Sequence, residues 1–252
     1  MKGVICAGGL ATRLYPLTHA TNKHLLPIYD KPMVYYPIQT LVNAGINEVL
    51  VIASGPHSGH FINVLKNGKE LGLKHLEYAY QENPKGGIAD AVALAEDFAD
   101  GDNIAVILGD NTTDADISAA VKNFVDGASV FVKKVPDPKR FGVPRFSDDK
   151  SKVLEIIEKP ANPPSNYAVT GLYLYDSKVF EYIKQCKPSD RGEMEITDIN
   201  NFYIKAGKLT WAELNGYWLD AGTFDTLLTA NLYWAKKANS SEHKKMLEYV
   251  KF

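Results

Sequence analysis

Residues 4–18 read VICAGGLATRLYPLT, and the change of character inside this stretch decides the fold class. It begins with a short apolar run, typical of a buried strand, which stops at Gly8 and Gly9. A glycine-rich turn at the carboxyl end of a strand lets backbone N–H groups approach a phosphate closely. That edge of the sheet is also where α/β folds place their ligands. The stretch therefore predicts a strand that leads into an anion-binding turn.

Outward from this stretch, short apolar runs alternate with helix-like segments. Residues 49–53 and 104–108 are expected to be buried parallel strands, and residues 129–135 a further strand. Apolar residues at helical spacing predict helices over 88–98 and 117–125. This alternation of strands and helices indicates an α/β fold with a parallel sheet.

The second half of the chain is richer in β-structure. Residues 153–157 and 167–175 are expected to be strands, and the alternation within the second suits a sheet with one exposed face. We therefore expect a smaller, β-containing lobe that binds substrate. The remaining expected elements are helices near 177–184 and 196–205, a strand near 209–213 and a terminal helix over 223–238.

Composition excludes several classes of protein. The 252 residues are 45% hydrophobic and 23% charged, the ordinary balance of a globular protein. Lys and Arg total 28 against 30 Asp and Glu, and the net charge of −2 offers no global attraction to nucleic acid or to an anionic membrane. No apolar stretch reaches the ~20 residues of a membrane span. Two cysteines, Cys6 and Cys186, are too few for a disulfide scaffold and predict a reducing cytoplasm.

Basic residues accompany the glycine turn. A glycine after a strand is most often only a structural turn, but here Arg13 and Lys23 follow it. Residues 8–37, GGLATRLYPLTHATNKHLLPIYDKPMVYYP, resemble the signature GGxGTRLxPxTxxxxKxLLPVxxKPMIxYP of the sugar-1-phosphate nucleotidyltransferases, in particular their thymidylyltransferase branch. One departure matters, because Ala11 stands where the family has a third glycine.

The resemblance implies a fold and a division of the chain. The fold is that of the nucleotide-diphospho-sugar transferases, with a Rossmann-like mixed, mainly parallel sheet flanked by helices and a smaller β-rich sugar-binding lobe. No linker separates independent domains, so we expect one catalytic domain over residues 1–238. Its nucleotide-binding part would span about 1–115 and its sugar-phosphate part about 116–222, and the tail over 239–252 is expected to be partly frayed.

Nucleotide binding is implied for the glycine turn and for a later glutamine. The turn residues with this role are Gly8, Gly9, Ala11, Thr12 and Arg13. The family holds the base with a glutamine and the glycine five residues later, which correspond to Gln81 and Gly86. A glutamine amide offers one acceptor and two donors, which fits the imide edge of thymine or uracil. At Ala11 we expect an ordinary backbone φ, because an intact set of Arg13, Lys23 and Lys159 would be odd beside a strained loop.

Two aspartates are predicted to bind Mg²⁺. Asp110 follows the strand over 104–108, where a hard carboxylate oxygen suits Mg²⁺ bound to phosphates, and the family uses this aspartate as a metal ligand. Residues 218–223, WLDAGT, match the family motif W-x-D-x-G-T, whose aspartate is Asp220. The six histidines show no metal-ligand spacing.

The resemblance places the sugar phosphate among residues further along the chain. The residues with this role are Asn111, Gly142, Glu158, Lys159 and Val169. Lys159 would pair with the phosphate, and Glu158 would accept hydrogen bonds from sugar hydroxyls. Residues 191–200, RGEMEITDIN, also match the family, and we expect Thr197 and Asp198 there to cap a helix first and to shape the pocket second.

The implied activity is nucleotidyl transfer, in which an oxygen of a sugar 1-phosphate attacks the α-phosphorus of a nucleoside triphosphate and releases pyrophosphate. No protein nucleophile is needed. Arg13 would hold the pyrophosphate, Lys23 the phosphates at the reacting centre and Lys159 the attacking phosphate. The expected substrates are dTTP and glucose-1-phosphate.

Alternatives remain open. UTP presents the same imide edge as dTTP, so a uridylyltransferase is one alternative. A non-catalytic nucleotide-sugar sensor is another, although the five charged residues of the site argue against it. A dinucleotide-binding dehydrogenase is disfavoured because no GxGxxG follows the first strand. A homo-oligomer is compatible with the sequence, whereas feedback regulation is not expected, because longer members of the family carry a further C-terminal helical region for it.

Overall fold

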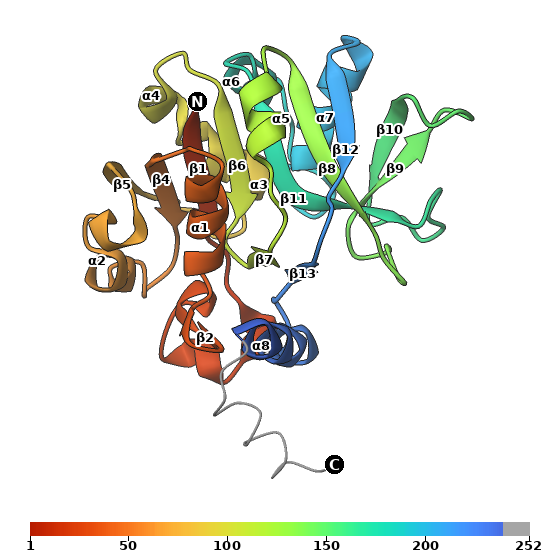
Figure 1. The fold of residues 1–252 in the computed structure, drawn as a ribbon. Coiled ribbons are helices and arrows are strands. Elements are labelled where there is room, and N and C mark those ends of the chain that lie inside the picture. The colour runs from red at the N-terminus through yellow and green to blue at the C-terminus, as the bar shows by residue number, and fades with distance from the viewer. Residues whose placement is uncertain (239–252) are drawn as a thin grey trace.

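The computed structural model describes residues 1–238, and its centre is a seven-stranded mixed sheet (Figure 1). The strand order is β12-β8-β11-β6-β1-β4-β5. These strands are β1 (Lys2–Ala7), β4 (Glu48–Ala53), β5 (His75–Tyr80), β6 (Ile104–Leu108), β8 (Ala128–Lys134), β11 (Tyr167–Tyr175) and β12 (Leu209–Glu213). All neighbours are parallel except β11, which runs antiparallel to β6 and β8. The predicted fold class, a mixed and mainly parallel sheet, is confirmed.

The apolar runs of the sequence form the middle of this sheet. Val4 on β1 lies opposite Leu50 on β4 and Val106 on β6, and all three side chains are buried. Strands that are covered on both faces need apolar side chains in both directions, which explains the continuous rather than alternating runs.

Helices cover both faces of the sheet (Figure 1). On one face lie α3 (Ile88–Ala93), α6 (Val179–Ile183) and α7 (Ile196–Lys205), and on the other α1 (Tyr35–Asn43), α2 (His60–Leu65) and α5 (Ser118–Asn123). The first layer buries Phe180 and Tyr203 against the sheet, and the second buries Leu41 and Phe61. The sequence did not predict α1, α2 or β5.

Strand β11 differs from its prediction as a half-exposed strand, because it is a central strand of the main sheet. Its alternation is between aromatic and aliphatic side chains, not between polar and apolar ones. Tyr173 and Tyr175 pack in the core under α3, α6 and α7, and Leu172 and Leu174 pack in the core under α1. Within residues 1–238, the strands of the small lobe are the antiparallel pair β9 (Gly142–Phe146) and β10 (Val153–Glu158).

The single helix predicted over 88–98 is two short helices, α3 and α4 (Glu96–Ala99). Both pack on the same core, so the apolar spacing is satisfied although the helix is interrupted at residues 94–95. Leu94 fits the helical spacing but is 42% exposed.

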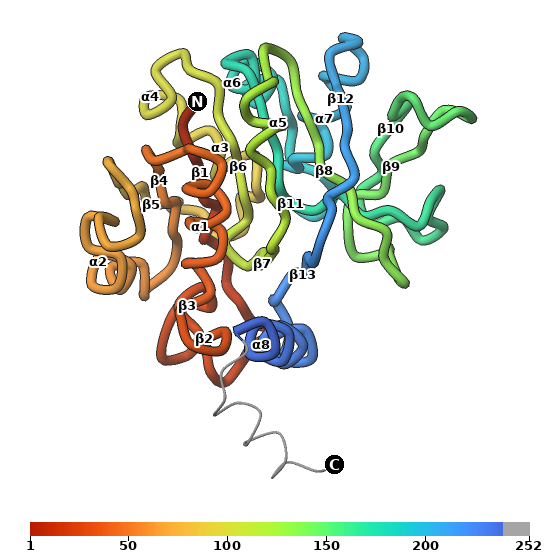
Figure 2. The backbone as a smooth tube through the Cα atoms, in the orientation of Figure 1, coloured from red at the N-terminus to blue at the C-terminus, as the bar shows by residue number. Residues whose placement is uncertain are grey.

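Short elements complete the chain. They are the strands β2 (Pro27–Ile28), β3 (Lys31–Pro32), β7 (Asn111–Thr113) and β13 (Trp218–Asp220), and the 3-10 turns η1 (Thr12–Leu14), η2 (Leu17–His19), η3 (Lys23–Leu25) and η4 (Lys69–Leu71). The terminal helix α8 (Phe224–Ala238) lies beside β2, apart from the main sheet (Figure 2). A separate core of Ile28, Met33, Tyr36, Ala221 and Ala230 joins it to the body.

Within residues 1–238, no helix combines the length and the apolar character that a membrane crossing requires. Cys6 and Cys186 are free thiols. The prediction of a frayed tail over 239–252 lies outside the described residues, and the division at residues 115 and 222 stays a prediction.

Candidate active site

Three parallel strands, β1, β4 and β6, end side by side, and the loops that follow them carry the candidate site. The backbone N–H of Gly9 donates to Ser54 Oγ at 2.8 Å, which joins the loops after β1 and β4. The backbone N–H of Gly109 donates to the Cys6 carbonyl at 2.9 Å, which places the loop after β6 beside the end of β1. The glycine turn and Asp110 therefore share the carboxyl edge of the sheet, as the sequence predicts.

Ala11 lies in the left-handed region, with φ 52° and ψ 31°, so the expectation of an ordinary φ is wrong. The chain leaves the glycine turn and enters η1 directly after Ala11, and this conformation makes the turn. Its carbonyl accepts hydrogen bonds from Leu14 N at 3.1 Å and Thr18 Oγ1 at 3.0 Å. An alanine held here costs on the order of 1 kcal/mol relative to its usual conformations.

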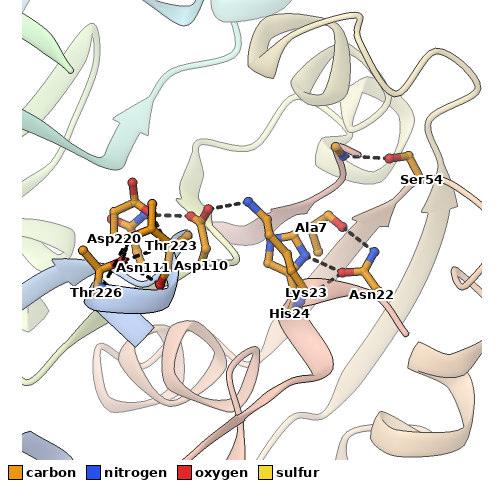
Figure 3. A network of polar contacts seen from close by, with 12 residues as sticks. Ala7, Asn22, Lys23, His24, Ser54, Asp110, Asn111, Asp220, Thr223 and Thr226 are labelled. Carbon is orange, nitrogen blue, oxygen red and sulfur yellow. Dashed lines mark hydrogen bonds and ion pairs between the residues drawn. The ribbon is translucent and has the colours of Figure 1, made fainter. Parts of the chain in front are cut away.

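Lys23 reaches the site from η3, which Asn22 holds in place. The Asn22 side chain accepts a hydrogen bond from His24 N at 3.0 Å and donates to the Ala7 carbonyl at 3.4 Å (Figure 3). Lys23 Nζ lies 2.5 Å from Asp110 Oδ2, and the two side chains are only 13% and 11% exposed. A buried ion pair thus links the loop after β1 to the loop after β6.

His24 and Asp110 are both buried at this ion pair, and burial shifts the pKa of each. Burial, together with the charge of Lys23, lowers the pKa of His24 to about 3, so its ring is neutral at physiological pH. Burial opposes ionisation of Asp110 as well, but the charge of Lys23 outweighs it and holds the pKa of Asp110 well below its usual range. Asp110 is therefore a carboxylate.

Asp220 joins the site through the short ladder between β7 and β13. Asp220 pairs with Asn111 in this ladder, and Ala221 N donates to the Asp110 carbonyl at 2.9 Å. A Cβ added to Gly222 would lie 2.7 Å from Asp220 Oδ1, 3.0 Å from Arg13 Nη2 and 3.5 Å from Asp110 Oδ2. The sequence-predicted residues Arg13, Asp110 and Asp220 therefore converge around one glycine.

The two aspartates fit a divalent cation. Burial and the nearby charge of Asp110 raise the pKa of Asp220, so a further cation between the two carboxylates would favour the ionised form of Asp220. Hard carboxylate oxygens are the ligands that Mg²⁺ prefers, and Mg²⁺ is commonly held by one or two carboxylates plus substrate phosphates. In residues 1–238 no cluster of three or more His, Cys, Asp or Glu side chains offers an alternative metal site.

A cavity of about 500 Å³ lies between the main sheet and the β9–β10 pair, and we name it the lobe cavity. All five residues predicted to bind the sugar phosphate line it, namely Asn111, Gly142, Glu158, Lys159 and Val169. Trp218 Nε1 donates to Asn111 Oδ1 at 2.6 Å and to the Thr170 carbonyl at 3.0 Å, which fixes the asparagine amide.

Thr197 does not cap α7, contrary to its predicted first role. The residue before the helix is Glu195, whose side chain makes no capping hydrogen bond, and Thr197 lies inside the first turn. Its hydroxyl donates instead to Glu158 Oε2 at 2.6 Å, and both residues line the lobe cavity. Asp198 lies beyond it on α7 and does not line this cavity.

Two arginines belong to the site although the sequence did not single them out. Arg140 Nη2 lies 3.3 Å from Asp220 Oδ2. Arg191 lies 2.7 Å from Glu195 Oε1 and 3.5 Å from Glu158 Oε1. A weak signal existed for both, because each stands beside or within a segment that matches the family.

A second cavity, of about 290 Å³, lies between the glycine turn and the start of α3, and we name it the glycine-turn cavity. Gly8, Gly9, Arg13 and Gln81, four of the residues predicted to bind the nucleotide, line it, and so does Lys23. Ala11, Thr12 and Gly86 do not line it, whereas Gly87 does, with a φ of 92° that favours glycine.

The two cavities share one wall. The residues that line both are Arg13, Ile88, Leu108, Asp110, Glu158 and Lys159. Groups bound in the two cavities would therefore meet at a boundary lined by two cationic and two acidic side chains.

Known proteins resemble this chain over nearly its whole length. Residues 2–237 match the nucleotidyl transferase family. A glucose-1-phosphate thymidylyltransferase of Neisseria gonorrhoeae is 46% identical over 235 residues, which cover 90% of this chain and 80% of that protein. One from Mycobacterium tuberculosis is 41% identical, with 91% and 81% covered.

Solved structures resemble the fold of this chain as well. A Bacillus anthracis protein assigned as a glucose-1-phosphate thymidylyltransferase, in complex with a sucrose, superimposes with a TM-score of 0.87 at 49% identity, covering 92% of this chain and 94% of that one. A UDP-glucose pyrophosphorylase complexed with UDP-glucose gives 0.81 at 23% identity, covering 94% and 98%, and shows the shared fold alone. The chain belongs to the nucleotidyl transferase family.

Proposed function

We propose that this protein is a glucose-1-phosphate thymidylyltransferase, which forms dTDP-glucose and pyrophosphate from dTTP and glucose-1-phosphate. The observation that carries the proposal is the shared wall of the two cavities. The nucleoside triphosphate would occupy the glycine-turn cavity and the sugar phosphate the lobe cavity, so that the α-phosphorus and the attacking oxygen meet between Arg13, Asp110 and Lys159. The substrates are those in the names of the relatives at 41–46% identity.

The reaction needs no nucleophile from the protein, because the attacking phosphate oxygen is already ionised. The thiol in the glycine-turn cavity is unsuited to that role, since burial raises the pKa of Cys6 to about 12. The chain's contribution is to position two anions that repel each other and to neutralise the charge that builds up on the leaving pyrophosphate.

The cationic residues divide this work. Arg13 and Lys23 would bind the triphosphate, whose oxygens can replace Asp110 as the partner of Lys23. Lys159 would hold the attacking phosphate at the shared wall. Glu158, which already accepts a hydrogen bond from Thr197, would use its free lone pairs for sugar hydroxyls.

Asp110 and Asp220 would hold Mg²⁺. When bound there, the ion would neutralise phosphate charge and act as a Lewis acid.

A pyrophosphate-release assay tests the proposal. dTTP, UTP, CTP, ATP and GTP are each combined with glucose-1-phosphate and with other sugar 1-phosphates in the presence of Mg²⁺. The highest kcat/KM is expected for dTTP with glucose-1-phosphate. A maximum with UTP would instead identify a uridylyltransferase, and tight nucleotide-sugar binding without any turnover would identify a sensor. The oligomeric state and the cytoplasmic location stay predictions.

A further inference from the structure

The side-chain amide of Gln81 lies at the wall of the glycine-turn cavity, where hydrogen bonds to other residues hold it. Gln81 follows β5 and is 4% exposed, and its backbone N–H donates to the Ala53 carbonyl at 2.8 Å. Its side-chain Nε2 donates to the Gly87 carbonyl at 3.1 Å and to Asp90 Oδ2 at 2.8 Å. Both amide hydrogens are therefore used within the protein.

This pairing fixes which atom of the amide faces away from α3. A carbonyl and a carboxylate only accept hydrogen bonds, so the NH₂ group must point toward Gly87 and Asp90. Oε1 is turned the other way, toward Gly8, where an added Cβ would lie only 2.6 Å from it. Within residues 1–238 no group donates a hydrogen bond to Oε1.

We infer that Asp90 is a positioning residue for base selection, which makes Gln81 an obligate hydrogen-bond acceptor toward the nucleotide base. This inference rests on the proposed function for the identity of the ligand. Thymine and uracil carry a donor at ring N3, whereas cytosine carries an acceptor there. A glutamine that could rotate would offer either its oxygen or its NH₂ and would discriminate poorly between them. A glutamine held by Asp90 accepts a hydrogen bond from the imide N–H of thymine or uracil. With cytosine, Gln81 Oε1 would instead face ring N3, so two acceptors would lie opposite each other.

The geometry of the adjacent loop supports the same role. A Cβ added to Gly86 would lie 2.2 Å from Asp90 Oδ2 and 2.6 Å from Asp90 Cγ. Gly86 therefore leaves the room in which the carboxylate reaches Gln81. Gly86 would therefore act on Gln81 through Asp90, since Gly86 itself does not line the cavity.

The backbone of this loop is itself fixed, so the carboxylate is the movable part. Met194 N donates to the Gly86 carbonyl at 2.8 Å, and Ala89 N donates to the Met194 carbonyl at 3.1 Å. Asp90 lies one residue after Ala89 in the first turn of α3. A substitution at residue 86 would accordingly displace the Asp90 side chain more readily than the loop.

The test uses dUTP and dCTP, which lack the 5-methyl group and differ only at the edge that Gln81 reads. Titration calorimetry gives the dissociation constant of each nucleotide, without sugar phosphate, for the wild type, Asp90→Leu, Asp90→Asn and Gly86→Ala. Wild type should prefer dUTP. Asp90→Leu, which keeps the shape and removes the acceptor, should narrow the dUTP/dCTP preference about tenfold, the size expected for one mispaired buried polar group.

The other variants separate positioning from a general structural effect. Asp90→Asn retains an acceptor oxygen and should keep the preference within about threefold of wild type. Gly86→Ala should narrow it as Asp90→Leu does, because it displaces the carboxylate, and it provides the same test if Asp90→Leu fails to fold. Asp97→Leu, which removes an exposed acidic residue from the first turn of α4, should leave the preference unchanged.

Each outcome decides the inference. The inference is overturned if Asp90→Leu and Gly86→Ala weaken the binding of dUTP and dCTP equally. It is also overturned if the wild type binds both nucleotides with equal affinity. Pyrophosphate release by the wild type is measured separately. If the wild type turns over but the dUTP/dCTP preference of the variants is unchanged, only the role of Asp90 is refuted. If the preference narrows but the wild type shows no turnover, only the proposed function is refuted.

Discussion

Lys23 Nζ and Asp110 Oδ2 form an ion pair of 2.5 Å in the wall of the glycine-turn cavity, and Asp110 also lines the lobe cavity. The same carboxylate is the predicted metal ligand, and the same ammonium is the predicted phosphate ligand. The Lys23 ammonium would therefore occupy the place of the cation at Asp110. The Asp110 carboxylate would likewise occupy the place of the phosphate at Lys23. Binding of Mg²⁺ and the triphosphate would exchange both partners without leaving either charge buried alone.

Metal dependence is the first expected consequence. Asp110→Asn and Asp220→Asn should each lower kcat/KM by orders of magnitude, because loss of an anionic ligand lowers metal occupancy and misplaces the phosphates. EDTA should abolish turnover of the wild type. Pyrophosphate release across a Mg²⁺ titration measures this, with the exposed Asp116→Asn as control. Full turnover of both site variants at low Mg²⁺ would rule out the assignment.

The same two variants should have different effects on stability in the absence of Mg²⁺. Asp110→Asn leaves the Lys23 ammonium buried without an anionic partner and should lower the free energy of unfolding by about 3–5 kcal/mol. Asp220→Asn removes a carboxylate whose pKa is raised by burial and by Asp110, so it should be neutral or stabilising. Urea unfolding at pH 7 compares them. A larger loss in Asp220→Asn would contradict the electrostatic account.

Ala11→Gly should stabilise the protein. The left-handed conformation costs alanine on the order of 1 kcal/mol, and glycine relieves it, although glycine's greater freedom when unfolded returns part of the gain. A net increase of a few tenths to 1 kcal/mol is expected, seen as a higher Tm. Ala20→Gly is the matched control, because Ala20 has a φ of −94° and should lose stability. A lower Tm for Ala11→Gly would mean that the turn is unstrained.

Gly222→Ala should impair catalysis more than folding. The added methyl group would lie 2.7 Å from Asp220 Oδ1 and 3.0 Å from Arg13 Nη2, and would push these two side chains apart. We expect kcat/KM to fall at least about tenfold while Tm shifts little, since misplacement of about 1 Å costs rate steeply. Gly59→Ala is the control, because nothing lies within 4 Å of its Cβ position. Unchanged kinetics of Gly222→Ala would separate Gly222 from the reacting centre.

Much of this site could be predicted because its signals are local in the sequence. The glycine turn, Asp110 and the WLDAGT motif each follow or form a strand whose place in the sheet the apolar runs already indicate. The residues predicted to bind the sugar phosphate came from the family resemblance, and all five line the lobe cavity.

What could not be predicted depends on tertiary contacts. The φ of Ala11 is set by the route of the chain into η1, which its side chain does not reveal. Threonine is a residue type that often caps helices. The hydroxyl of Thr197 donates to Glu158 instead, because β10 packs beside α7. In β11, the alternation of Tyr and Leu resembles that of a half-exposed strand. The sequence does not show that helices cover both faces of this strand.

Nucleotidyl transfer at the shared wall can be followed by ³¹P NMR of a single reaction. Purified protein is incubated with dTTP, glucose-1-phosphate and Mg²⁺, and the phosphorus products are quantified over time. Pyrophosphate and dTDP-glucose are expected in equal amounts, only when both substrates are present, and no inorganic phosphate is expected. Release of inorganic phosphate, or of pyrophosphate without the sugar phosphate, would contradict nucleotidyl transfer.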